Sequence, residues 1–282
     1  MTGKRPNSCT NLNKALLRLA GSDESFLDIR ATLANVIVGQ LLPDCVVKGG
    51  SQLKLRFGPL ASRVTMDLDT ARSIELDDFI KRFRTALAKG WNDFTADLIV
   101  KAQASPKGIP FEYVMQPLDV KLRYRGQPWY TILVEVGHNE IGDADEADRI
   151  PLPSEIVQIF GKLGFPDPEP IPLMPLKYQV AQKLHGLTAK DSDRVRDVID
   201  LQLIARAGID LSAVRPICEQ LFAYRKCQPW PPKVEKGKNW DSLYNAARGA
   251  LPVCPTVDEA IDWANDFITK IDKAEDRGSD HA

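Results

Sequence analysis

The sequence is poor in the residues and segments that mark several classes of protein. Only 3 of the 282 residues are histidines, and none of the 5 cysteines belongs to a Cys-x-x-Cys pair. A zinc site or a disulfide framework is therefore not expected. No apolar run reaches the roughly 18 residues of a membrane-spanning helix, and the first residues lack the apolar segment of a signal peptide. We expect a cytoplasmic protein that does not contact a membrane.

Composition and charge are those of an ordinary globular protein. Hydrophobic residues make up 44% and charged residues 27% of the chain, which excludes a disordered, collagen-like or coiled-coil chain. The length allows one large domain or two ordinary ones. Because the net charge is only −1, any surface that binds nucleic acid has to be local.

The hydrophobic pattern divides the chain in two. Apolar residues at helical spacing predict helices over 11–20, 24–42 and 73–89, and strand-like runs fall at 45–47, 97–102, 113–124 and 129–137. Residues 164–175 carry five prolines and cannot be helical. Beyond them, helical patterns dominate over 175–187, 193–207, 211–224, 241–250 and 256–272. We predict a mixed α/β (α+β) domain over 1–172 and a helical domain over 173–282.

The first chemical signal is Lys48-Gly49-Gly50-Ser51, which precedes apolar residues at helical spacing. The free N–H groups at the start of a helix form a site for phosphate, so Gly49, Gly50 and Ser51 are candidate phosphate-binding residues. Taken alone, a Gly-Gly pair is an ordinary turn. The G-x-x-x-x-G-K-[ST] motif is absent, so this is not a Walker site.

The second signal is the stretch 63–69, whose strict alternation predicts a strand. Val64, Met66 and Leu68 would then face a core, whereas the other face would carry Arg63, Thr65, Asp67 and Asp69. Two carboxylates on one face repel each other unless a cation lies between them. Mg²⁺, with Mn²⁺ as an alternative, suits such a pair next to a bound phosphate. The competing interpretation is a solvated surface.

Glu135 is the candidate for a third metal ligand. It interrupts the apolar strand Ile132-Leu133-Val134-Glu135-Val136, where an unpartnered acid is costly to bury. It either faces the same cleft as the two aspartates or points outward from a half-buried strand. Asp119 is a weaker competitor for the same role.

The third chemical signal is a set of oppositely charged residues in the predicted helical domain. Lys183 lies at the edge of one apolar stripe, and Asp197 and Asp200 lie one turn apart on the next helix. Lys183 would contact a triphosphate, with Asp197 orienting it or acting as a base for an acceptor hydroxyl. The alternative is an ordinary salt bridge between two amphipathic helices. His185 is expected at the surface.

Residues 215–240 mix basic side chains with Trp230 and Trp240. Such a mixture can hold an RNA backbone and stack a base. The alternative is a solvated surface over core tryptophans.

Together these motifs resemble the AbiEii-type nucleotidyltransferase toxins of type IV toxin–antitoxin systems. The resemblance rests on the Gly-Gly-Ser turn, the Arg-x-Thr-x-Asp-x-Asp stretch and the Gln-Lys-Leu helix followed by Arg-Asp-x-x-Asp-Leu. In this sequence they are Gly49, Gly50, Ser51, Arg63, Thr65, Asp67, Asp69, Gln182, Lys183, Leu184, Arg196, Asp197, Asp200 and Leu201.

The resemblance implies a polymerase-β-like nucleotidyltransferase fold and an enzyme that moves nucleotides from an NTP to the 3′ end of tRNA, which blocks translation. It also implies a cognate antitoxin. Asp67, Asp69 and Glu135 would hold metal, and Arg63 and Lys183 would help Gly49, Gly50 and Ser51 to bind the nucleotide. Two alternatives stay open: an acceptor that is a protein hydroxyl or a small molecule, and a silent module that binds nucleotide or antitoxin without catalysis.

Overall fold

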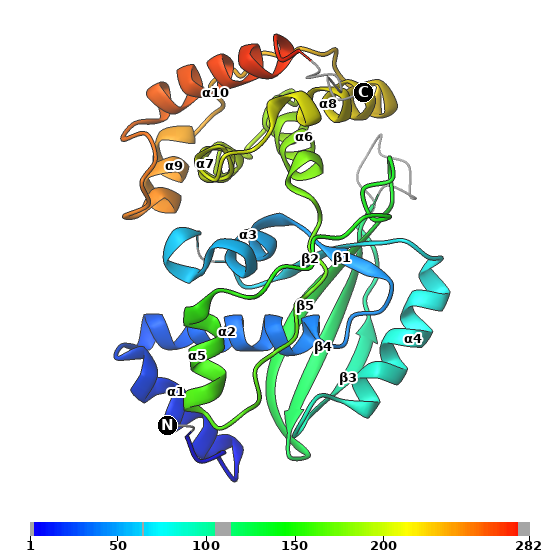
Figure 1. Cartoon of the computed structure of the whole chain (residues 1–282), viewed down its shortest axis with the longest axis vertical. Coiled ribbons are helices and arrows are strands. Elements are labelled where there is room, and N and C mark those ends of the chain that lie inside the picture. Colours follow the sequence, from blue (N-terminus) through cyan, green and yellow to red (C-terminus); the bar gives the residue numbers. More distant parts are fainter. Residues whose placement is uncertain (1–2, 64, 105–113, 276–282) are drawn as a thin grey trace, which may run out of the picture. The chain divides into compact units, whose positions relative to one another are not determined.

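The structure is a computed structural model that describes residues 3–63, 65–104 and 114–275 (Figure 1). Contacts between residues divide the chain into two compact units. The first unit contains Met1–Leu60, Val64–Asn139 and Ala144–Met174, and the second contains Ala61–Arg63, Glu140–Asp143 and Pro175–Ala282. Two short segments, 61–63 and 140–143, therefore belong to the second unit by their contacts, although the first unit surrounds them in sequence.

The first unit is built on a sheet which, over the described residues, has five strands in the order β1-β2-β5-β4-β3. These strands are β1 (Cys45–Val47), β2 (Leu68–Arg72), β3 (Phe94–Val100), β4 (Gln116–Tyr124) and β5 (Gln127–His138). β2 and β5 are parallel, and the other neighbouring pairs are antiparallel. The parallel pair aligns Asp69 with Glu135 in register, so it brings together two acids that are far apart in sequence.

Helices cover this sheet through apolar faces that the sequence spacing supplies. They are α1 (Cys9–Ala20), α2 (Asp23–Gly39), α3 (Gly49–Phe57), α4 (Leu76–Lys89) and α5 (Ser154–Lys162). On α4, Phe79, Phe83 and Leu87 follow one another at four-residue intervals and are fully buried, because residues one turn apart share a face. Helices α1 and α2 pack against β5, α3 against β2 and α4 against β3 (Figure 1).

Helix α2 differs from the other helices because it runs through the core. Residues 31–39 are all buried, so the second half of α2 is enclosed on every side. Such a helix is expected to be apolar all round, yet Asn35 lies within it at 1% exposure.

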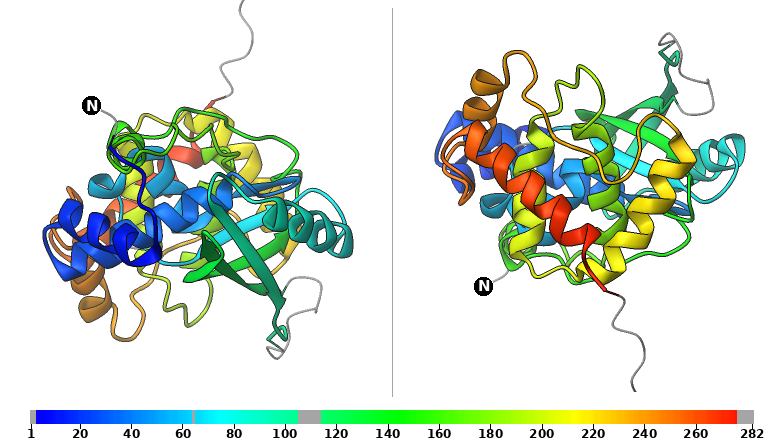
Figure 2. Two further views of the ribbon diagram at one scale, coloured as in Figure 1. Left: turned by 90° about the horizontal axis from the view of Figure 1, so that it is seen from below. Right: turned by 90° about the horizontal axis from the view of Figure 1, so that it is seen from above.

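The second unit is helical. Its helices are α6 (Leu176–Leu187), α7 (Arg196–Arg206), α8 (Leu211–Arg225), α9 (Trp240–Arg248) and α10 (Val257–Asp272). Helix α6 packs against α7 and α8, and α10 packs against α7, α8 and α9. Figure 2 shows α10, in orange to red, crossing its neighbours. No helix among the described residues of either unit is both long enough and apolar enough to cross a membrane.

The predicted fold class is confirmed, and most predicted elements coincide with observed ones within a few residues. The strand predicted over 63–69 is wrong in its first part, because β2 begins at Leu68. Met66, expected in the core, is 42% exposed, and Val64 lies outside the described residues. Side chains, and not a neighbouring strand, hydrogen-bond the backbone before β2. The alternation of polar and apolar residues over this stretch therefore does not come from a β-strand. Helix α5 was not predicted.

Candidate active site

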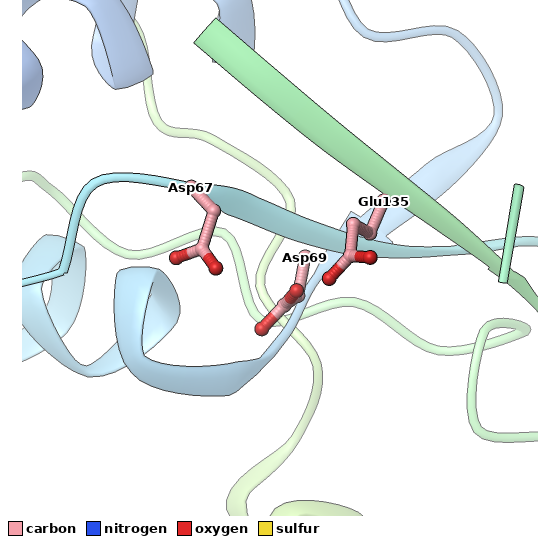
Figure 3. Close-up of side chains that lie close together, drawn as sticks. All are labelled: Asp67, Asp69 and Glu135. Atoms are coloured by element: carbon pink, nitrogen blue, oxygen red, sulfur yellow. The ribbon is translucent and has the colours of Figure 1, made fainter. Parts of the chain in front are cut away.

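Three carboxylates converge at one place in the first unit. Asp67 immediately precedes β2, Asp69 lies in β2, and Glu135 lies opposite Asp69 on β5. One oxygen from each lies within 4.8 Å of the oxygens of the other two. Figure 3 shows the three side chains turned toward a common space. The third acid of the cluster is thus Glu135, whereas the competitor Asp119 lies 3.5 Å from the ammonium group of Lys101.

This cluster needs a positive partner. Carboxylates at such separations repel one another, and an opposite charge among them favours their ionised forms. A hard divalent cation with oxygen ligands satisfies this requirement. All three residues are partly exposed, so the oxygens are accessible to an ion from solution. Among the described residues, Asp67, Asp69 and Glu135 form the one group of three or more acids, histidines or cysteines whose spacing suits a metal ion.

The glycine turn lies directly against the acids. Gly49 begins α3 with a φ of +68°, and a Cβ atom built on it would lie 2.1 Å from Oδ2 of Asp69. Only glycine fits there, because any side chain would collide with the carboxylate and the left-handed backbone would be strained. The main-chain N–H of Lys48 also donates to the carbonyl oxygen of Asp69 at 2.8 Å. The start of α3 and the acidic cluster are therefore one local structure.

Helix α3 begins at the glycine turn that the sequence marked as a candidate phosphate site. The first N–H groups of a helix have no acceptor inside the helix, and those of α3 begin at the Gly49-Gly50-Ser51 turn. The Ser51 hydroxyl is already engaged, because it is 1% exposed and donates to the carbonyl oxygen of Asp67. A hydroxyl has one proton to donate, so in this structure the Ser51 side chain does not donate to a phosphate.

A buried network of charges lies in the second unit. The Lys183 ammonium group is 2.9 Å from Oδ1 of Asp197 and 2.6 Å from Oδ2 of Asp200. Arg63 is 3.1 Å from Asp200, and Arg194 is 2.7 Å from Asp197. Four of the predicted residues are thus joined in one network: Arg63, Lys183, Asp197 and Asp200.

The ion pairs determine whether Lys183 and Asp197 are charged. Burial by itself lowers the pKa of Lys183, but the Asp197 and Asp200 carboxylates outweigh it and leave that pKa above its ordinary value. Burial by itself raises the pKa of Asp197, and Lys183 and Arg194 more than reverse this, so the pKa of Asp197 is below its ordinary value. Both groups are charged at neutral pH, and Asp197 is a weak proton acceptor.

His185 is not at the surface, so that prediction is wrong. It is 7% exposed, its ring packs edge-on against Phe222, and its Nδ1 lies 3.2 Å from the Arg225 guanidinium. Burial, followed by the charge of Arg225, lowers the pKa of His185 to about 4. The ring faces inward because it fills space between α6 and α8.

Three of the six basic residues in the stretch 215–240 form ion pairs within the second unit. Arg225 bonds Glu140, Arg215 bonds Glu219, and Lys236 bonds Asp241 and Asp258. Trp240 is 1% exposed, and its indole N–H donates to the carbonyl oxygen of Ser192. Trp240 is therefore a core residue, whereas Trp230 is half-buried and its indole N–H donates to Asp272 at 3.0 Å.

These motifs match a known family over most of the chain. The sequence model described as "Nucleotidyl transferase AbiEii toxin, Type IV TA system" matches residues 32–266. The chain belongs to this family. It is accordingly a nucleotidyltransferase toxin of a type IV toxin–antitoxin system, which implies an NTP substrate and an antitoxin partner. The AbiEii resemblance predicted from the sequence is confirmed.

A solved structure of another toxin agrees on the fold. MenT4, a nucleotidyltransferase toxin from Mycobacterium tuberculosis H37Rv, is similar with a TM-score of 0.61 at 18% identity, over 93% of this chain and 90% of that chain. JHP933 from Helicobacter pylori has a TM-score of 0.48 at 14% identity, over 89% of this chain and 93% of that chain. No curated protein sequence matches the chain.

Proposed function

We propose that this AbiEii protein is a Mg²⁺-dependent toxin that transfers nucleotides from an NTP to the 3′ end of tRNA, and so blocks translation in the cytoplasm. The observation that carries the proposal is the convergence of Asp67, Asp69 and Glu135 beside the start of α3. Family membership supplies the reaction class. The tRNA acceptor rests on the resemblance of the sequence to that family.

The acidic cluster fits Mg²⁺ by its donor set. All three ligands are carboxylate oxygens, which hard cations prefer. Mg²⁺ commonly binds through one or two protein carboxylates and completes its shell with water and substrate phosphates. The absence of a side chain at Gly49 lets the Asp69 carboxylate lie directly against the start of α3. Mn²⁺ accepts the same ligands and is the alternative.

The reaction is a displacement at the α-phosphorus of the NTP. The acceptor hydroxyl gives up its proton to water and its oxygen bonds to the α-phosphorus. The bond from that phosphorus to the oxygen that bridges the α- and β-phosphates breaks, and pyrophosphate leaves. Cations bound at the carboxylates would ease ionisation of the hydroxyl and neutralise charge on the pyrophosphate. Asp67, Asp69 and Glu135 fix the position of that charge. The main-chain N–H groups of Gly49, Gly50 and Ser51 would donate to the β- and γ-phosphates.

The second unit would contribute through its buried network. The resemblance to the family assigns Lys183 and Arg63 to binding of the triphosphate, where a positive charge would stabilise the charge that develops during the reaction. Because the pKa of Asp197 is lowered, Asp197 fits the role of a partner that orients Lys183 better than the role of a base. Lys183→Arg keeps the charge. A higher KM for NTP in a stably folded Lys183→Arg variant supports a phosphate contact, and unchanged kinetics contradict it.

The deciding experiment offers the protein each labelled NTP in turn with Mg²⁺ and total RNA. The proposal expects label in a band of tRNA size, removal of the label by digestion from the 3′ end, and no label with Asp67→Asn. Label on protein would replace the tRNA acceptor with a protein hydroxyl. No transfer to any acceptor by the folded wild type would contradict the proposal.

A further inference from the structure

The acid Asp67 differs from Asp69 and Glu135 in how the fold supports it. The latter two lie on hydrogen-bonded strands, whereas Asp67 lies in the turn before β2. A carboxylate on such a turn needs other contacts to hold its position, because a ligand that is free to move binds metal weakly. Two chains of buried polar contacts end on this residue.

The first chain comes from α3. The Lys54 ammonium group is 2% exposed and is held by Asp28 of α2 at 2.6 Å. It lies 3.5 Å from the carbonyl oxygen of Thr65, a long contact between a charge and a dipole. The Thr65 hydroxyl then donates to Oδ1 of Asp67 at 2.8 Å. Because a carboxylate has two oxygens, this bond fixes the orientation of Asp67 and leaves Oδ2 to act as a ligand.

The second chain comes from α2. The Asn35 side-chain N–H donates to the Ser51 hydroxyl at 3.3 Å, and Ser51 donates to the carbonyl oxygen of Asp67. The Asn35 amide oxygen is buried and has no hydrogen-bond partner among the described residues. An unsatisfied buried acceptor destabilises a fold, so Asn35 is a poor choice for stability in the buried half of α2, where Thr32 is the one other polar residue.

We propose that Asn35 and Lys54 are positioning residues for the metal site: through Ser51 and Thr65 they hold the main chain and the carboxylate of Asp67 in the orientation that the cation requires. Neither residue belongs to the Gly-Gly-Ser or Asp-x-Asp motif. The inference rests on the proposed function, since it assumes that Asp67 binds a divalent cation.

Direct Mn²⁺ binding, followed by electron paramagnetic resonance of free Mn²⁺, tests this without an assay of activity. Lys54→Met removes the ammonium group at nearly constant volume, and we expect it to weaken Mn²⁺ binding about tenfold or more. Arg56→Met is the matched control, because Arg56 also lies on α3 and loses an ion pair, with Asp148 at 2.5 Å, that does not reach the 65–67 turn. We expect Arg56→Met to bind Mn²⁺ as the wild type does.

Asn35→Leu separates positioning from folding. It removes the unsatisfied amide oxygen, so the melting temperature without metal should stay or rise, while Mn²⁺ affinity should fall about tenfold. Its control is Thr32→Val, at another buried polar residue of α2, whose hydroxyl donates, among the described residues, to the carbonyl oxygen of Asp28 in its own helix. A purely structural role for Asn35 predicts the reverse pattern, with lower stability and unchanged affinity.

The outcomes are distinguishable. If the wild type binds Mn²⁺, Asp69→Asn does not, and Asn35→Leu binds like the wild type, the proposed metal site stands and the positioning role is overturned. An equal loss of affinity in Lys54→Met and Arg56→Met overturns the role of Lys54. If Lys54→Met does not fold, Asn35→Leu decides. A folded wild type that binds no Mn²⁺ overturns the proposed metal site itself.

Discussion

Asp69 and Glu135 stand opposite each other on the parallel strands β2 and β5, so a single register pair supplies two of the three clustered acids. The neighbouring pair, Thr70 and Val136, strengthens this alignment, because the buried Thr70 hydroxyl donates to the carbonyl oxygen of Glu135 at 3.2 Å. A slip of one residue would turn one acid to the opposite face of the sheet. The register of these two strands is therefore the structural basis of the site.

Glu135→Gln tests the third acid. The substitution keeps the size of the side chain and removes its charge, so we expect metal-dependent transfer to fall by about two orders of magnitude and the protein to stay folded. Activity as a function of metal concentration, with circular dichroism as the folding check, measures this. Asp119→Asn is the matched control, because Asp119 lies on β4 and pairs with Lys101. Equal activities of Glu135→Gln and Asp119→Asn would remove Glu135 from the site.

Gly49→Ala tests the contact between the glycine turn and the acids. The new Cβ would overlap Oδ2 of Asp69, so the carboxylate has to move and we expect metal affinity and transfer activity to fall about tenfold or more.

The control for this prediction is Gly21→Ala. Gly21 has a φ of +75°, close to that of Gly49, but nothing lies within 4 Å of its added Cβ. Both variants carry the same backbone strain, of about 1 kcal/mol. Activity lost in Gly49→Ala and retained in Gly21→Ala would assign the loss to Asp69, and equal activities would contradict this.

The buried ring of His185 predicts a loss of stability in mild acid. Its pKa is about 4 in the fold and about 6.5 in the unfolded chain. Between these values the unfolded chain binds more protons, so the free energy of unfolding decreases as the pH falls. The contribution is about 2 kcal/mol between about pH 7.5 and about pH 5. Urea unfolding followed by tryptophan fluorescence measures it, and His185→Asn should show a shallower pH dependence. Parallel curves for the two proteins would contradict the assignment.

Lys183→Met tests the buried network of the second unit. It leaves Asp197 and Asp200 with one cation fewer in a buried setting, so we expect the free energy of unfolding to fall by about 3 kcal/mol. Arg194→Met removes an exposed cation from the same Asp197 and should cost less than about 1 kcal/mol. Urea titrations of both variants give the comparison. A Lys183→Met variant as stable as the wild type would show that the network does not stabilise this unit.

The sequence predicted those parts of the site that depend on local pattern. Asp67, Asp69 and the glycine turn are close in sequence, and the interruption of an apolar strand marked Glu135. The pairing of Glu135 with Asp69 depends on which strands become neighbours, and a single strand does not contain that information.

Other features lay beyond sequence reasoning for the same reason. Alternation over 63–69 predicted a strand, but the main-chain carbonyl groups of Thr65 and Asp67 accept hydrogen bonds from side chains of α3. Asn35 left one signal, a polar residue in an apolar run. Lys54 and His185 have polar side chains that normally face solvent, and only their partners across the fold, Asp28 and Arg225, reveal why they are buried.

The central claim is that Asp67, Asp69 and Glu135 together bind a divalent cation. Calorimetric titration of the wild type with Mn²⁺, beside the charge-neutral double variant Asp69→Asn/Glu135→Gln, tests it most directly. We predict saturable binding to the wild type, competition by Mg²⁺, and no binding to the double variant while its circular dichroism spectrum is unchanged. Equal Mn²⁺ binding by the two proteins would contradict the claim.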